Sequence, residues 1–117
     1  MWRMKYFKET EFNNFKMMDK KLLAMLDNMR ELYGYPIKIT SSYRSPEHSI
    51  EAAKQEPGEH SYGAAVDIVS DGGGKTFRLV KAAIEAGFTR IGISRKKGFI
   101  HLGIGYPGAP AKTIWTY

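Results

Sequence analysis

The sequence feature that most constrains the fold is a short apolar segment, Ala64–Val69, which contains one carboxylate, Asp67. All its other residues are apolar, and a run of this length and composition is typical of a buried strand. A charged side chain in such a strand is costly unless it is paired or binds a metal ion. The segment therefore predicts a buried strand in which Asp67 has a partner.

The sequence on either side of this strand predicts further helices and strands around it. We expect a short helical turn near Phe7, Phe12 and Phe15, a helix from about Lys20 to Tyr33, a strand from Pro36 to Thr40, a polar turn and a helix start at Ser45-Pro46, a loop from Lys54 to Gly63, a helix from about Lys75 to Ala86, and a hairpin of Thr89–Ser94 with Phe99–Ile104. This order predicts one α+β domain over residues 1–117, with a small, mostly antiparallel sheet packed with helices.

The two longer helices have recognisable ends. Asp19 is typical of an N-cap, and Gly34 of the residue that terminates a helix. Gly87 terminates the second helix, whose apolar stripe, Phe77, Val80 and Ile84, we expect to pack on the core.

Composition excludes several classes of protein. The chain has 117 residues and no cysteine, which excludes a disulfide scaffold, a thiolate zinc finger and a cysteine nucleophile. Its net charge of +6 favours anionic partners, but the basic residues are spread along the chain and form no nucleic-acid-binding motif. No segment resembles a signal peptide or a membrane span.

Two histidines can meet Asp67. His60 lies seven residues upstream, across Gly63, and His101 lies within the last apolar run. Two imidazoles and a carboxylate from three places form a three-ligand zinc site, which leaves a position open for water. On residue types alone, the alternative is equally good: Asp67 is paired with an arginine, and His101 is a core histidine with its hydrogen bonds satisfied.

The element His60-x2-Gly63-x-Ala65-x-Asp67 lies downstream of Ser41-Ser42-Tyr43-Arg44-Ser45-Pro46 and upstream of His101. This arrangement resembles the zinc D-alanyl-D-alanine carboxypeptidase family, and specifically its short, endolysin-type phage and bacterial peptidases. The resemblance implies the fold shared by DD-peptidases and the hedgehog domain. It also implies hydrolysis of peptide bonds in peptidoglycan stems, of D,D or L,D type, by water activated on zinc.

The resemblance also implies roles for individual residues. His60, Asp67 and His101 would bind one Zn²⁺ ion, and Arg44 would steady the substrate carbonyl or the oxyanion, unless it forms a structural salt bridge. Ser42, Ser61 and Tyr62 would contact the substrate, and His48 would be a surface or loop residue.

One departure from the family concerns the general base. Relatives carry an acidic residue or a histidine close to the last zinc histidine, and they tend to have Val-Asp where this chain has Leu102-Gly103. No Asp or Glu follows Glu85, so Glu59 or Glu56 is the expected base. The missing acid leaves a second hypothesis open, an inactive zinc-binding relative that binds cell wall or serves in a virion.

A phosphate-binding loop is a third hypothesis, at Asp71-Gly72-Gly73-Gly74-Lys75-Thr76, but Val69 stands where that motif needs glycine. We therefore expect a monomeric peptidase whose partner is peptidoglycan peptide, with neither nucleic acid nor membrane insertion. Without a signal peptide, it would be made in the cytoplasm and act at the cell wall or periplasm after release, or be virion-associated.

Overall fold

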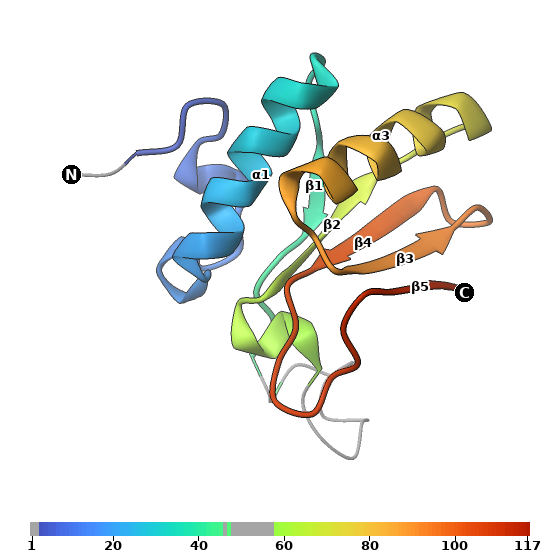
Figure 1. Ribbon diagram of the computed structural model, residues 1–117. Helices are drawn as coiled ribbons and strands as arrows, with labels where there is room; N and C mark the ends of the chain where they lie inside the picture. The colour runs from blue at the N-terminus through green and yellow to red at the C-terminus, as the bar shows by residue number, and fades with distance from the viewer. Residues whose placement is uncertain (1–2, 46, 48–57) are drawn as a thin grey trace.

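Two helices cover one face of a five-stranded sheet in the computed structural model, which describes residues 3–45, 47 and 58–117 (Figure 1). The elements are η1 (Glu9–Glu11), η2 (Phe15–Met17), α1 (Lys20–Tyr33), β1 (Ile39–Ser41), η3 (Glu59–Tyr62), β2 (Ala65–Val69), α3 (Gly73–Ala86), β3 (Arg90–Ser94), β4 (Phe99–Gly103) and β5 (Thr113–Thr116). The strand order is β1-β2-β4-β3-β5. Neighbouring strands are antiparallel except β3 and β5, which are parallel. The predicted α+β class, with a mostly antiparallel sheet, is confirmed.

Helix α1 has the predicted boundaries. The Asp19 carboxylate accepts hydrogen bonds from the backbone N–H groups of Lys21 and Leu22, and Gly34 adopts the left-handed conformation with φ of 86°. These contacts satisfy backbone groups that would otherwise lack partners at the helix ends. The buried face of α1 consists of Leu22, Leu23, Leu26 and Met29.

Helix α3 begins at Gly73 and ends before Gly87. Of its predicted core stripe, Val80 packs against the core, but the other two residues do not. Phe77 is 71% exposed and Ile84 is 54% exposed. The helix instead buries Thr76, Leu79, Ala82 and Ala83. The small alanine side chains allow α3 to pack closely against α1, and this tertiary contact outweighs the hydrophobicity of the larger side chains on the next face.

The hairpin of β3 and β4 is confirmed, whereas two other predictions change and one strand was not predicted. Strand β1 starts at Ile39 instead of Pro36, and Ile37 is buried just before the strand. The predicted loop contains η3 at residues 59–62. Strand β5 was not predicted, because it follows a stretch with two prolines and two glycines and pairs with a strand about twenty residues earlier. The predicted helix start at Ser45-Pro46 extends outside the described residues.

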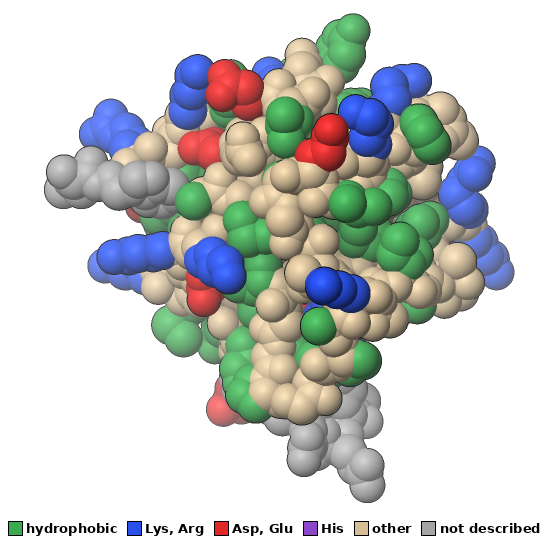
Figure 2. All heavy atoms as spheres, in the orientation of Figure 1, with side chains coloured by type: hydrophobic (Ala, Val, Ile, Leu, Met, Phe, Trp, Pro, Cys, Tyr) green, Lys and Arg blue, Asp and Glu red, His purple; other side chains and the backbone are tan. Residues whose placement is uncertain are grey.

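Neither the basic side chains on the surface nor the helices mark a binding patch or a membrane span in the part of the chain that is described and shown. Lys and Arg side chains are scattered over the face shown in Figure 2 and form no single patch there. Among the described residues, no helix combines the length and apolar character that crossing a membrane requires.

Candidate metal centre

Successive side chains of the sheet alternate between the buried core and a polar face. In β2 and β4 the side chains of Val66, Ile68, Ile100 and Leu102 are fully buried in the core. Asp67 and His101 lie between these residues in the sequence and therefore point to the opposite face. The register places Asp67 directly opposite His101, so two of the predicted ligands are cross-strand neighbours.

His60 reaches the same place from η3. Gly63 ends this short helix with φ of 64°, and a side chain there would collide with the backbone carbonyl of Met17. The imidazole is held from behind because Nδ1 lies 2.6 Å from the backbone carbonyl oxygen of Ser42. The backbone N–H of Arg44 donates to the His60 carbonyl at 3.2 Å, which joins the Ser41–Arg44 segment to η3.

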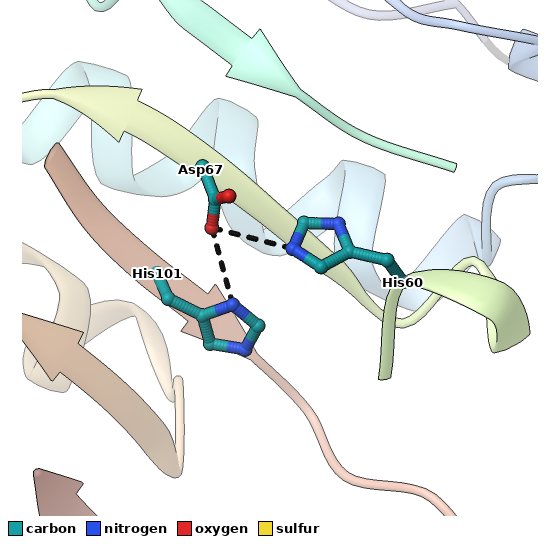
Figure 3. Close-up of side chains that lie close together, drawn as sticks. All are labelled: His60, Asp67 and His101. Carbon is teal, nitrogen blue, oxygen red and sulfur yellow. Dashed lines mark hydrogen bonds and ion pairs between the residues drawn. The ribbon is translucent and has the colours of Figure 1, made fainter. Parts of the chain in front are cut away.

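The three side chains converge on one point (Figure 3). Asp67 Oδ1 lies 3.3 Å from His60 Nε2 and 3.1 Å from His101 Nδ1. All three ligand atoms lie within 4.8 Å of one another. Zinc bonds of about 2.0–2.1 Å in a tetrahedron place neighbouring ligand atoms about 3.3 Å apart. The two measured separations fit that geometry.

Hydrogen-bonding chemistry supports a cation at this point. A carbonyl oxygen only accepts, so His60 Nδ1 must be the protonated nitrogen, and Nε2 of the neutral ring carries a lone pair. That nitrogen is buried and makes no hydrogen bond to the described residues, although the Asp67 carboxylate is adjacent. Two lone pairs that face each other repel unless a cation lies between them. The donor set therefore fits a metal ion, and two imidazoles with a carboxylate suit zinc.

Glu59 lies on the far side of the His101 ring. Its Oε1 is 2.7 Å from His101 Nε2, the nitrogen that does not face Asp67. Its Oε2 accepts from the Gly105 backbone N–H at 2.7 Å and lies 3.1 Å from Arg90 Nε. Glu59 was predicted as the base, and in this structure its carboxylate contacts the imidazole from behind.

The ionisation of these groups follows from their contacts. Burial alone would raise the pKa of Asp67, but the neighbouring His101 and His60 side chains hold it well below its usual range. Burial would lower the pKa of His101, but hydrogen bonds to Asp67 and Glu59 outweigh it and raise that pKa. Burial would raise the pKa of Glu59, but His101, the Gly105 N–H and Arg90 together outweigh it and lower that pKa. In the metal-free protein both carboxylates therefore stay charged, and His101 favours the protonated form.

His60, Asp67 and His101 line a cavity of about 540 Å³. Its wall includes Arg44, which the resemblance assigned to substrate, and the two lysines of the β3–β4 turn, Lys96 and Lys97. Trp115 and Tyr117 of the C-terminal strand region form an aromatic side of the same cavity.

The predicted substrate residues are placed differently from Arg44. Ser42 is 1% exposed, and its hydroxyl accepts from the Asn13 backbone N–H at 2.7 Å. The Ser61 hydroxyl is buried. Tyr62 is exposed and stacks on Tyr106, which does line the cavity. Direct contact between these three residues and a substrate stays a prediction. His48 and Glu56 lie outside the described residues.

Sequence reasoning missed Arg90 and Trp115. Arg90 pairs with Glu59, and its guanidinium lies over the Trp115 and Tyr106 rings at 5.0 and 5.5 Å from their centroids. Trp115 contacts the His101 ring, with centroids 5.3 Å apart, and covers Gly92. An arginine at the start of a predicted strand was a signal for Arg90, whereas Trp115 depended on the unpredicted β5.

Comparison with known proteins agrees with this geometry. A family profile described as Peptidase M15 matches residues 3–103. The chain belongs to the peptidase M15 family. M15 membership indicates a zinc-dependent metallopeptidase, and it confirms the resemblance drawn from the sequence. The match includes all three metal-binding candidates and ends before β5. No curated protein matched the chain.

Proposed function

We propose that this M15 protein is a zinc peptidase that hydrolyses peptide bonds in the stem peptides of bacterial peptidoglycan. The observation that carries the proposal is the convergence of His60 Nε2, Asp67 Oδ1 and His101 Nδ1 on one point at the wall of an open cavity. Three protein ligands leave one position of a zinc ion open, which is the arrangement of catalytic zinc sites. A bound zinc ion would supply an activated water molecule and polarise the scissile carbonyl.

The chain's own residues would bind and orient the peptide. Arg44 lies in the cavity wall, and its permanent charge and planar set of donors suit the carbonyl oxygen that becomes negative during hydrolysis. Lys96 and Lys97 add positive charge to the cavity rim, which favours an anionic substrate such as a stem peptide with free carboxylates. Ser42, Ser61 and Tyr62 remain proposed substrate residues, with Tyr62 acting through its stacking on Tyr106.

The proton acceptor decides between turnover and its alternative. Glu59 and Asp67 are the two carboxylates among the described residues that line the cavity. Asp67 is a metal ligand in this proposal, and both oxygens of Glu59 already contact hydrogen-bond donors. The engagement of Glu59 favours the second candidate function, an inactive zinc-binding relative that binds cell-wall peptide or serves in a virion.

The test is digestion of purified peptidoglycan by the zinc-loaded protein, with mass spectrometry of the released fragments and a parallel reaction containing chelator. New fragments that disappear with chelator support the peptidase and identify the bond. Zinc-loaded protein that releases none contradicts the peptidase and supports the inactive relative, which should still co-sediment with peptidoglycan.

A substitution tests the role of Arg44 in the same assay. Arg44→Ala should keep the metal and lose about 10²–10³-fold in activity, as removal of an oxyanion donor does. Arg78→Ala is the matched control, because Arg78 is exposed on α3 and does not line this cavity. Equal digestion by the Arg44→Ala variant and its parent would contradict the assignment.

A further inference from the structure

We propose that Glu59 is a positioning residue that orients His101 for metal binding, and that Gly103 is required because the Glu59 carboxylate occupies the space of a side chain at that position. The proposal rests on the metal site of the proposed function. It does not depend on peptide hydrolysis.

The first observation is the set of contacts that holds the Glu59 carboxylate in one place. The side chain is buried, at 5% exposure, and its two oxygens contact a ring nitrogen, a backbone N–H and a guanidinium. Oε1 faces His101 Nε2 at 2.7 Å, while Oε2 contacts the Gly105 N–H and Arg90. A carboxylate with this many donors has one preferred orientation, and it transmits that orientation to the ring it contacts.

The second observation is the absence of a side chain at Gly103. This residue follows His101 by two positions in β4, so a side chain there would point to the same face of the sheet as His101. A Cβ built at Gly103 would collide with all three atoms of the Glu59 carboxylate. Gly103 is not among the glycines with positive φ, so its backbone conformation does not require glycine. The space for Glu59 is the remaining physical reason.

These observations determine which nitrogen of His101 faces the metal. When a metal ion occupies the site, Nδ1 beside Asp67 must present its lone pair, so the remaining proton is on Nε2, whose hydrogen bond the Glu59 carboxylate accepts. A carboxylate behind a metal-binding imidazole fixes the tautomer and increases the basicity of the ligand. His60 uses the opposite arrangement, with Nδ1 held by the Ser42 carbonyl and Nε2 directed to the metal position.

Zinc affinity of purified protein, measured by competition with a chromophoric chelator, tests the role of Glu59. Glu59→Gln should weaken zinc binding about 10- to 100-fold, the range for loss of such a partner. Glu85→Gln is the matched control, because Glu85 lies on the exposed side of α3 and pairs only with Lys81 among the described residues. Metal-free Tm is measured in parallel. A lower Tm with zinc affinity within twofold of the parent would show a merely structural role and overturn the proposal.

Relocation of the carboxylate tests the role of Gly103. Gly103→Ala should weaken zinc binding because it displaces Glu59, whereas Gly73→Ala should not, since a Cβ there meets only the Arg95 side chain at ordinary contact distance. The double variant Glu59→Ser with Gly103→Asp places a carboxylate in the same space from β4 instead of η3. It should recover at least tenfold of the affinity lost by Glu59→Ser alone, and no recovery would contradict the proposal.

A measurement on the unaltered protein keeps the proposal testable even if these variants do not fold. In the zinc-loaded protein, long-range ¹⁵N–¹H NMR of the imidazoles should show His101 protonated at Nε2 and His60 protonated at Nδ1. A His101 ring protonated at Nδ1 would overturn the proposal. Because none of these readouts measures hydrolysis, a protein that digests no peptidoglycan can still pass them, and failure of the two proposals is distinguishable.

Discussion

Replacement of Asp67 by asparagine tests the proposed metal centre through the stabilisation of the folded protein by zinc. One oxygen of this carboxylate contacts both imidazoles, at 3.1 and 3.3 Å, so Asp67 links the other two proposed ligands. Asparagine keeps the size of the side chain and removes the negative charge. We expect the variant to fold and to lose most of the stabilisation that zinc provides.

The magnitude follows from binding to the folded state alone. Free zinc at one hundred times its Kd stabilises the folded protein by about 2.7 kcal/mol. For a domain of this size that is a rise in Tm of about 11 °C. If asparagine weakens binding a hundredfold, the same zinc concentration provides about 0.4 kcal/mol, or about 2 °C.

The assay is calorimetric unfolding, with chelator and with buffered zinc, of the parent and of the Asp67→Asn and Asp71→Asn variants. Asp71→Asn is the control, because Asp71 is exposed and pairs with Lys75 outside the cavity. That control should keep the full zinc-dependent rise. An Asp67→Asn protein whose Tm rises with zinc as much as that of the parent would refute the assignment of Asp67 as a ligand.

Three further predictions concern the fold and its pH dependence. Asp19→Ala should lower the free energy of unfolding by about 1 kcal/mol through loss of the α1 N-cap, and an unchanged urea midpoint would contradict it. Gly92→Ala should cost about 1–3 kcal/mol, because its Cβ would lie 2.6 Å from Trp115 Cε2. Unchanged tryptophan emission and Tm would contradict that displacement. Burial lowers the pKa of His101, but hydrogen bonds to two carboxylates outweigh burial and raise it above 6.5. Zinc must displace this proton, so zinc affinity should fall as pH falls through the raised pKa, whereas metal-free stability should fall as pH rises through it. Zinc titrations across this pH range test the direction of the change in affinity. A zinc-dependent rise in Tm that does not change with pH would contradict the prediction.

The parts of the fold that could be predicted are those encoded by neighbours in the chain. Helix α1 was predicted with both ends, because Asp19 and Gly34 are local signals. The hairpin and β2 were predicted because their apolar runs are bounded by polar or glycine residues. The core face of α3 was wrong for Phe77 and Ile84, because the choice between the alanine face and the Phe77 face depends on α1, which is distant in the sequence.

The site shows the same division. His60, Asp67 and His101 were recognised from residue type, spacing and resemblance, and the structure brings them together. The position of Glu59 could not be predicted, because it depends on the space above Gly103, forty-four residues away in the chain. Trp115 reaches His101 only through the long-range pairing of β5 with β3. Local patterns and the resemblance therefore identified the candidate ligands, and tertiary packing supplies the residues that contact them.

The most direct test of the central claim is a crystal structure of the zinc-loaded protein with data collected on both sides of the zinc absorption edge. We predict one anomalous peak per chain, within bonding distance of His60 Nε2, Asp67 Oδ1 and His101 Nδ1. A peak at any other place, or none at this cluster in protein that carries one zinc ion per chain in solution, would contradict the account.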